Sequence, residues 1–394
     1  MGLAVQSATQ CSVNSSAISS EALKVCTRCV MDTTDPNITF EDGVCHHCRD
    51  FERNKNSRIV LGAEGEARLQ SIVQKIKEDG KGSEYDCILG ISGGVDSAYV
   101  AYKAKQLGLR PLAVHFDNGW NSELAVSNIE ATLNKLGIDL FTYVVDWNEF
   151  KNLQLSILKA STPDAEIPTD HAIYALLIQT AIKHGVKYIL NGMNYSSEGI
   201  VIPAWAYGHS DWRYIKDVQK KFGSVKLKTY PHYSLLYLFY AMIVRRVKFV
   251  SILNYIEYDK EKAIEELKSE LNWRPYGGKH HESVYTRFFQ SYILPRKFNI
   301  DKRKAHLSNL IHSQSGDMTR ERALQELKKD PCDAGLLSQD LSFVVKKMDL
   351  TEVQFEEMMQ APLKCFRDYK TNYNLVRKLK KLQHFMRKVG IFYK

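Results

Sequence analysis

Ser92-Gly93-Gly94-Val95-Asp96-Ser97 is the stretch of sequence that decides the fold of this chain. It follows an apolar stretch, residues 87–91, and precedes a helix-like stretch, residues 98–103, so it predicts a turn from a strand into a helix. At such a turn the backbone N–H groups point at one spot, where the helix dipole favours negative charge. The two glycines let the backbone approach a phosphate closely, and Ser97 is expected to cap the helix.

Asp96 is the unusual member of this run. A carboxylate beside phosphates is repulsive unless Mg²⁺ bridges the two. The pattern G-x-x-x-x-G-K-[ST] of the common phosphate loop is absent at this turn. The sequence therefore predicts a magnesium-nucleotide site of another kind, with Asp96 as the Mg²⁺ ligand and all six residues, Ser92 to Ser97, around the nucleotide.

Strands and helices alternate on both sides of this turn. Strands are predicted at residues 86–91, 111–117, 140–146 and 187–190, with one more near 249–256, and helices at 98–107, 121–136, 147–159 and 171–184. This alternation predicts an α/β fold with a doubly wound parallel sheet. After residue 200 the chain is expected to be mostly helical, including a helix at 260–271.

Two further strand ends carry polar or glycine-rich sequence. Asp117 and Asn118 follow one strand, and Asn191 and Gly192 follow another. Ligands of such sheets bind beyond the carboxyl ends of the strands, so we expect these residues to meet the ribose or adenine of the same nucleotide. Trp120 is a possible stacking face for the base.

Four of the eight cysteines have the spacing of a zinc ribbon. Cys26 and Cys29 form one C-x-x-C pair and Cys45 and Cys48 the other, with fifteen residues between them. Four thiolates held this way bind zinc tetrahedrally, and the metal replaces a core too small to form alone. Redox chemistry and an iron–sulfur cluster are the alternatives, but no βαβ pattern surrounds either pair. The prediction is structural Zn²⁺.

A second candidate site lies in the C-terminal half. Gly277, Gly278, Lys279 and His280 combine flexible backbone with a cation, and Arg287 continues the positive charge. These residues are expected to bind a phosphate-bearing substrate, with Lys279 neutralising charge on a leaving pyrophosphate. The alternative is a plain loop followed by a solvated basic helix.

Composition is that of a globular protein with a basic end. The net charge is +9, and residues 369–394 contain eight basic side chains and no acidic one. The apolar stretch 233–244 is too short to span a bilayer and is expected to be a buried helix. Residues 1–22 lack the pattern of a signal peptide, which favours a cytoplasmic protein.

These features divide the chain into five parts. They are a disordered leader at 1–23, a zinc-ribbon module at 24–52, a connector helix at 53–82, the nucleotide-binding α/β domain at 83–258, and a helical substrate or partner region with the basic tail at 259–394.

The loop resembles the S-G-G-x-D-S signature of the PP-loop ATP pyrophosphatases, whose fold is of the adenine nucleotide alpha hydrolase-like type. Together with the cysteine pairs, H-F-D-N-G-W, L-N-G-M-N and G-G-K-H-H-E-S, it is similar to the N-acetyl sugar amidotransferases of bacterial surface-glycan biosynthesis. This resemblance runs from about residue 24 to about residue 330. The loop signature by itself indicates only the superfamily. The zinc knuckles and the later G-G-K-H are the features that indicate the amidotransferase family.

The resemblance implies a reaction. An acetamido group on a nucleotide-linked sugar, in lipopolysaccharide O-antigen or related pathways, becomes an acetamidino group. ATP adenylates the amide oxygen, pyrophosphate leaves, and ammonia then displaces AMP. The implied catalytic residues are Ser92, Asp96 and Lys279, with ATP, Mg²⁺ and structural Zn²⁺ as cofactors.

Ammonia has no evident source in this chain. Position 2 is Gly2 and no lone cysteine lies in a glutaminase-like elbow, so a separate glutaminase subunit is expected, with a channel-forming companion as a further possibility. Residues 233–244 or the basic tail are candidate docking surfaces. The rival functions are a tRNA-modifying PP-loop enzyme, thiolating or lysidine-type, and a non-enzymatic ATP-binding scaffold. Nucleic acid is the less favoured partner, because every C-x-x-C pair lies before residue 49 and thiolation needs a pair near ATP.

Overall fold

The central sheet of the protein contains five parallel strands. A computed structural model describes residues 23–276, 282–313 and 318–379. The strands of the sheet, in spatial order, are β5 (Asp139–Val144), β4 (Pro111–Asp117), β3 (Cys87–Gly90), β6 (Tyr188–Leu190) and β7 (Lys248–Val250). Every neighbouring pair is parallel. The predicted doubly wound sheet is confirmed.

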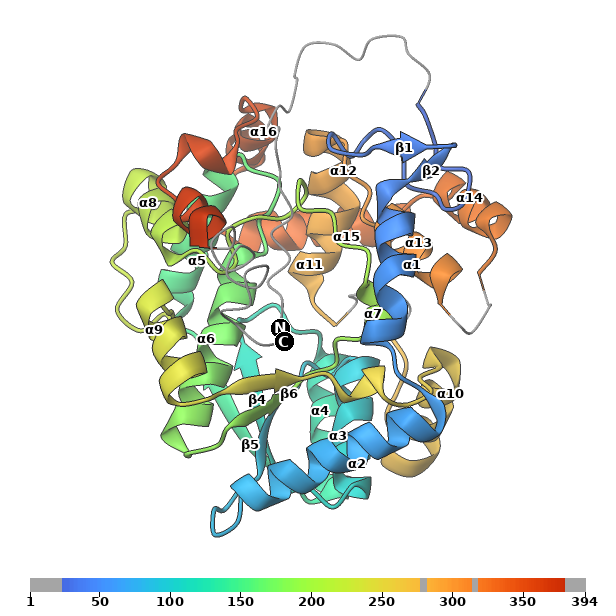
Figure 1. The fold of residues 1–394 in the computed structure, drawn as a ribbon. Coiled ribbons are helices and arrows are strands. Elements are labelled where there is room, and N and C mark those ends of the chain that lie inside the picture. The colour runs from blue at the N-terminus through green and yellow to red at the C-terminus, as the bar shows by residue number, and fades with distance from the viewer. Residues whose placement is uncertain (1–22, 277–281, 314–317, 380–394) are drawn as a thin grey trace.

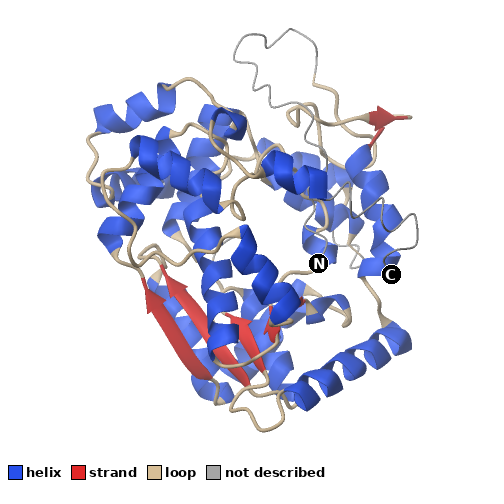
Figure 2. Ribbon diagram, turned by 60° about the vertical axis from the view of Figure 1, so that its left-hand side comes forward, coloured by secondary structure: helices blue, strands red, loops and turns tan. Residues whose placement is uncertain are grey.

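Helices cover both faces of this sheet (Figure 2). The helices of the α/β unit are α3 (Val95–Gln106), α4 (Glu123–Leu136), α5 (Trp147–Lys159), α6 (Ile167–Lys183) and α10 (Lys260–Leu271). Alternate side chains of a strand point to opposite faces. Ile88 of β3 accordingly packs in the core that includes α5 and α6, while Cys87 and Leu89 pack in the core that includes α3, α4 and α10. Both faces of β3 are therefore buried, which explains its continuous apolar sequence.

The strand order places a switch point between β3 and β6. From β3 the chain builds outward through β4 and β5, and it then returns to the other side of β3 to form β6 and β7. The carboxyl ends of β3 and β6 therefore face a crevice, which is where ligands of such sheets bind.

A small module precedes the sheet. It contains a hairpin of β1 (Phe40–Glu41) and β2 (Val44–Cys45), followed by α1 (His46–Arg58) and α2 (Gly62–Asp79). The connector predicted as one helix over 53–82 is thus two helices, and the first begins inside the zinc module. The break has a local cause: Ile59 and Leu61 are extended, and Gly62 has φ +67°, which a helical residue does not adopt.

The remaining elements are helices and helical turns that follow β6 in the chain. They are α7 (Tyr195–Glu198), α8 (Trp212–Phe222), α9 (Leu235–Phe239), the π-helical turn Tyr240–Val244, the 3₁₀ turns Ile252–Asn254 and Phe366–Asp368, α11 (Val284–Phe288), the π-helical turn Phe289–Ile293, α12 (Leu294–Phe298), α13 (Arg303–His312), α14 (Arg320–Lys328), α15 (Ala334–Lys347) and α16 (Glu352–Gln360). Figure 1 shows the β1–β2 hairpin beside α13 and α14, although almost 300 residues separate them.

Two local predictions differ from the structure. The loop predicted up to residue 170 ends earlier, because α6 starts at Ile167 with Pro168 in its first turn, a position that needs no backbone N–H. The last strand is short, since β7 ends at Val250 and a 3₁₀ turn follows. Within the described residues, no helix is both long enough and apolar enough to cross a lipid bilayer.

Candidate active site

The turn after β3 has the predicted form of a strand, a glycine turn and a helix. Gly93 has φ +81°, and a Cβ there would lie 2.4 Å from the carbonyl oxygen of Ala125, so only glycine fits. The N-cap of α3 is Gly94, not Ser97 as predicted. Ser97 instead lies in the first turn, where its hydroxyl donates to the Gly94 carbonyl and accepts from the Ser92 N–H. The loop is therefore braced by its own serines.

Asp96 is held by two partners from distant parts of the chain. The Tyr258 hydroxyl donates a hydrogen bond to Asp96 Oδ1. Burial, followed by the neighbouring Asp96 carboxylate, raises the pKa of Tyr258, so this tyrosine remains a proton donor. On the other side Gly192 packs so closely that a Cβ would lie 3.0 Å from Asp96 Cβ. Sequence reasoning missed Tyr258, since it is 162 residues away.

The segment after α10 closes over the same loop. Trp273 Nε1 donates to the Gly93 carbonyl over 3.1 Å, and the Val95 N–H donates to the Tyr276 hydroxyl over 3.1 Å. Val95 is the first residue of α3, so this N–H is one that points out of the helix N-terminus. The tyrosine oxygen therefore occupies a place that a phosphate oxygen would take. Neither aromatic residue was predicted to belong to the site.

A cavity of about 550 Å³ lies at the carboxyl ends of β3 and β6, beside this loop. The predicted residues that line it are Ser92, Gly94, Val95, Asp96, Ser97, Asn118, Asn191 and Gly192. The structure thus brings together three segments that the sequence placed at three strand ends. Backbone N–H groups, a carboxylate and an apolar wall in one cavity of this size fit the phosphates, Mg²⁺ and base of a nucleotide.

Further parts of the cavity wall come from α6 and from the start of the C-terminal region. Glu166, Asp170 and Tyr174 line it from α6 and its N-cap, and Thr286 and Lys302 line it from the C-terminal side. Thr286 donates its hydroxyl proton to Glu166 Oε2 over 2.6 Å. The sequence carries no motif around Glu166 or Asp170, and only the helical spacing of four residues relates them.

Gly93, at the tight turn of the loop, does not line the cavity, and three further predicted residues have side chains that do not face it. Asp117 does not line it; its Oδ1 accepts from the Gly119 N–H and from Asn121. Trp120, offered as a stacking face, is wholly buried and donates through Nε1 to Gln154. Arg287 forms two hydrogen bonds of 2.7 Å with Asp340 and so braces α11 against α15. Each was placed by nearness in sequence, which does not determine the direction of a side chain.

The proposed phosphate turn falls outside the described residues. Gly277, Gly278, Lys279 and His280 all belong to residues 277–281, which the structure does not describe. Their predicted roles therefore stay predictions. The described residues on either side, Tyr276 and Glu282, both line the cavity.

The four cysteines of the two pairs form one buried cluster. Their Sγ atoms lie 3.8 Å apart for Cys26 and Cys48, 3.7 Å for Cys29 and Cys45, and 3.6 Å for Cys45 and Cys48. A tetrahedral zinc ion with bonds of about 2.3 Å requires sulfur–sulfur edges of about 3.8 Å. The geometry fits zinc. Hydrogen bonding among the sulfurs lowers the pKa of Cys26 and raises the pKa values of Cys45 and Cys48, so the four thiols share their protons.

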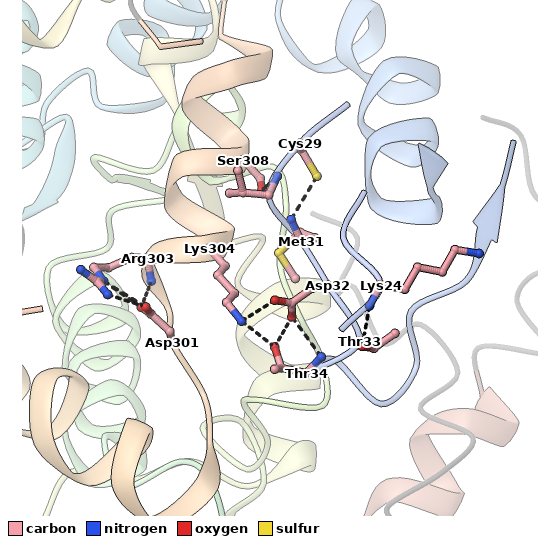
Figure 3. Close-up of polar contacts among 11 residues, drawn as sticks. Lys24, Cys29, Met31, Asp32, Thr33, Thr34, Asp301, Arg303, Lys304 and Ser308 are labelled. Atoms are coloured by element: carbon pink, nitrogen blue, oxygen red, sulfur yellow. Dashed lines mark hydrogen bonds and ion pairs between the residues drawn. The ribbon is translucent and has the colours of Figure 1, made fainter. Parts of the chain in front are cut away.

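The cysteine module is fastened to α13 and α14. The Val30 N–H donates to Ser308 Oγ, and Lys304 forms an ion pair of 2.6 Å with Asp32, as Figure 3 shows. Arg320 donates to the carbonyls of Cys26 and Cys29, and His312 Nε2 lies 3.1 Å from Cys48 Sγ. The module therefore packs against the C-terminal region and does not extend freely from the sheet.

The apolar stretch 233–244 is a surface element and not the buried helix that was predicted. It forms α9 and a π-helical turn, and the side chains of Leu236, Phe239 and Ile243 are 82%, 61% and 60% exposed. The side chains of Tyr233 and Ala241 point inward and are buried. Hydrophobicity alone suggested burial, but only part of this stretch reaches the core: Leu238 packs partly against it, whereas Leu236, Phe239 and Ile243 stay exposed.

One family model matches this chain. Residues 282–382 match the model described as "LPS biosynthesis protein WbpG-like, C-terminal domain". This result agrees with the family that the sequence motifs suggested, and it extends past residue 330, where the motif resemblance ends. No curated protein sequence matches the chain.

Solved structures with similar parts are distant. NMN synthetase from Francisella tularensis is 14% identical, with 58% of this chain and 93% of that chain covered and a TM-score of 0.29. The NH3-dependent NAD synthetase from Campylobacter jejuni is 15% identical, with coverages of 53% and 85% and a TM-score of 0.28. A predicted subunit of a tRNA methyltransferase from Methanocaldococcus jannaschii is 12% identical, with coverages of 46% and 75% and a TM-score of 0.27.

Proposed function

We propose that this chain, whose residues 282–382 match a WbpG-like domain of lipopolysaccharide biosynthesis, is an ATP-dependent, AMP-forming amidotransferase. Its substrate is a nucleotide-linked N-acetylated sugar, and its product carries an acetamidino group in place of the acetamido group. One observation carries the proposal. The cavity is lined both by Ser92 and residues 94–97 of the glycine loop and by Glu282, Ser283 and Thr286, which belong to the WbpG-like region.

The chemistry follows from the poor leaving ability of an amide oxygen. Transfer of AMP from ATP to that oxygen releases pyrophosphate and one proton and leaves an O-adenylated imidate. Ammonia then adds to the imidate carbon, AMP departs with the C–O bonding electrons, and the amidine remains. The loop N–H groups at the start of α3 would hold the phosphates, and Asp96 would hold Mg²⁺, which offsets their charge.

The test is an assay of the purified, zinc-loaded protein with Mg-ATP, ammonium and a panel of UDP-linked N-acetylated sugars. We expect AMP, pyrophosphate and, by mass spectrometry, a sugar in which one oxygen has been replaced by NH. Formation of ADP and phosphate would contradict the cleavage site. AMP formation with bulk tRNA and with none of the sugars would favour the tRNA-modifying alternative.

We further propose that ammonia comes from a separate cytoplasmic glutaminase subunit that docks on α9 and the π-helical turn, with a channel-forming companion as the less direct arrangement. The support is the exposed apolar row of Leu236, Phe239 and Ile243, followed directly by Arg245 and Arg246. Exposed apolar clusters of this kind are typical of protein interfaces.

The double variant Leu236→Ser with Phe239→Ser tests the docking surface. Glutamine-dependent turnover with the partner present should fall about ten-fold, whereas ammonium-dependent turnover should not change. Val126→Ser, at an apolar residue exposed on α4, is the matched control. Equal glutamine use by the purified chain alone would overturn the need for a partner.

A further inference from the structure

The part of the cavity wall that α6 forms is acidic, and the chemistry proposed so far gives it no task. Glu166 and Asp170 are four residues apart at the start of α6, so they lie on one face of the helix, and both line the cavity. Phosphates are repelled by such a wall. The acids therefore face a different part of the reaction from the one that the glycine loop serves.

Glu166 has an unused acceptor. Its side chain is 8% exposed, and Oε2 accepts the Thr286 hydroxyl proton. Oε1 is buried and has no hydrogen-bond partner in the described part of the chain. A buried carboxylate oxygen without a donor is costly, so its presence beside a cavity points to a ligand that brings a donor.

The charges around these acids favour a cation. The titratable groups that act on them are Asp164, whose Oδ1 accepts the Glu166 N–H, Lys302, which lines the cavity, and His209. Burial, with a further contribution from Asp170, raises the pKa of Glu166 to about 8, although Thr286 opposes the shift. Burial and Asp164 raise the pKa of Asp170 to about 6. Three carboxyl groups therefore interact with one another and with a single lysine. This excess of acidic groups favours a bound cation or a bound proton.

A hydrogen-bonding cation fits this wall better than a metal ion. Among the described residues, the carboxylate, imidazole and thiol groups close enough to chelate a metal are the four cysteines and the set Asp35, His46 and His47; the acids of α6 do not form such a set. Ammonium instead needs single oxygen acceptors in several directions, as Glu166 Oε1 offers.

We propose that Glu166 and Asp170 form the ammonium site of this enzyme, which receives the nitrogen nucleophile and removes its proton. The inference rests on the amidotransferase function proposed above. One proton passes from ammonium to a carboxylate, and the ammonia formed adds its lone pair to the imidate carbon. One N–H proton moves to the imidate nitrogen, and AMP leaves with the C–O electron pair. The product amidinium is a cation, and the carboxylate that did not take the proton pairs with it.

The test compares two nitrogen sources in the full chain. Glu166→Gln and Asp170→Asn each replace one titratable carboxyl group by an amide, and Glu123→Gln, an exposed acid of α4, is the control. Each protein is assayed for sugar-dependent exchange of pyrophosphate into ATP without any nitrogen source. Turnover is then measured with ammonium chloride and with hydroxylamine, which is mostly unprotonated at neutral pH and needs no base.

We expect both site variants to retain the exchange reaction and to raise the KM for ammonium about ten-fold or more, the loss expected for a hydrogen bond to a charged group. Hydroxylamine turnover should change by less than about three-fold, since no proton must be removed. An unchanged KM for ammonium, with exchange intact, would overturn the ammonium site alone. Loss of exchange in the variants would place the acids in adenylation instead. Absence of exchange in the unaltered protein with every sugar would overturn the proposed function itself.

Discussion

At the scale of single residues, Gly93 is the position where the loop is least tolerant. Gly93→Ala would place a Cβ 2.4 Å from the Ala125 carbonyl oxygen, in addition to the strain of a positive φ. Gly137→Ala is the matched control, because Gly137 has φ +58° and open space around it. The control should lose about 1 kcal/mol of unfolding free energy from backbone strain alone. Gly93→Ala should lose about 2 kcal/mol or more in urea unfolding, together with AMP formation; equal losses would contradict the packing argument.

The residues of the site divide by whether a local pattern identifies them. Ser92, Asp96 and Asn191 were predicted, because each lies in a short motif at a strand end, and all three line the cavity. Tyr258 and Glu166 were not, since what brings them to the site is the crossover of the sheet and the packing of α6. No spacing in the sequence encodes those contacts.

At the scale of elements, a cysteine substitution tests whether bound zinc stabilises the helices that pack against the cysteine module. α1 begins directly after Cys45, and α13 contacts the cluster through Ser308 and His312. Cys48→Ser should reduce bound zinc from one ion per chain to none and lower the unfolding free energy by on the order of 4 kcal/mol. Cys332→Ser, a partly buried thiol outside the cluster, should retain both zinc and stability. Metal analysis and thermal unfolding check this, and full stability without zinc would contradict a structural role.

Elements were predicted well where hydrophobic period and tertiary packing agree. The strand Pro111–Asp117 and the helices Trp147–Lys159 and Lys260–Leu271 have the predicted bounds. The stretch 233–244 differs, because its apolar side chains are exposed and hydropathy cannot distinguish a core from a docking surface. The two C-x-x-C pairs could be predicted as a zinc site from this sequence alone, because the spacing of the ligands reflects the geometry of the metal itself.

At the scale of the whole molecule, the dependence of stability on pH isolates Glu166. The pKa of this carboxyl is raised in the folded state to about 8 by burial, so between pH 4.5 and 8 the unfolded chain binds fewer protons, and stability falls as pH rises. The buried histidines act oppositely. Burial lowers the pKa of His171 to about 4, and likewise lowers those of His115 and His312. These histidines therefore raise stability with pH until their unfolded forms, with a pKa of about 6.5, have lost their protons at about pH 7.5.

The contribution of Glu166 between pH 6.5 and 7.5 is obtained by comparing the unaltered protein with Glu166→Gln. The histidines, Asp170 and Lys297, whose pKa burial lowers to about 8, contribute to the stability of both proteins. Across this window the unfolding free energy of the unaltered protein should fall by about 1 kcal/mol relative to that of Glu166→Gln, because glutamine does not titrate. Glu123→Gln should behave like the unaltered protein. Chemical denaturation at several pH values measures the difference. Equal pH dependence in Glu166→Gln and in the unaltered protein would show that Glu166 does not titrate in this window, and the acidic wall would then be ionised before any ligand arrives.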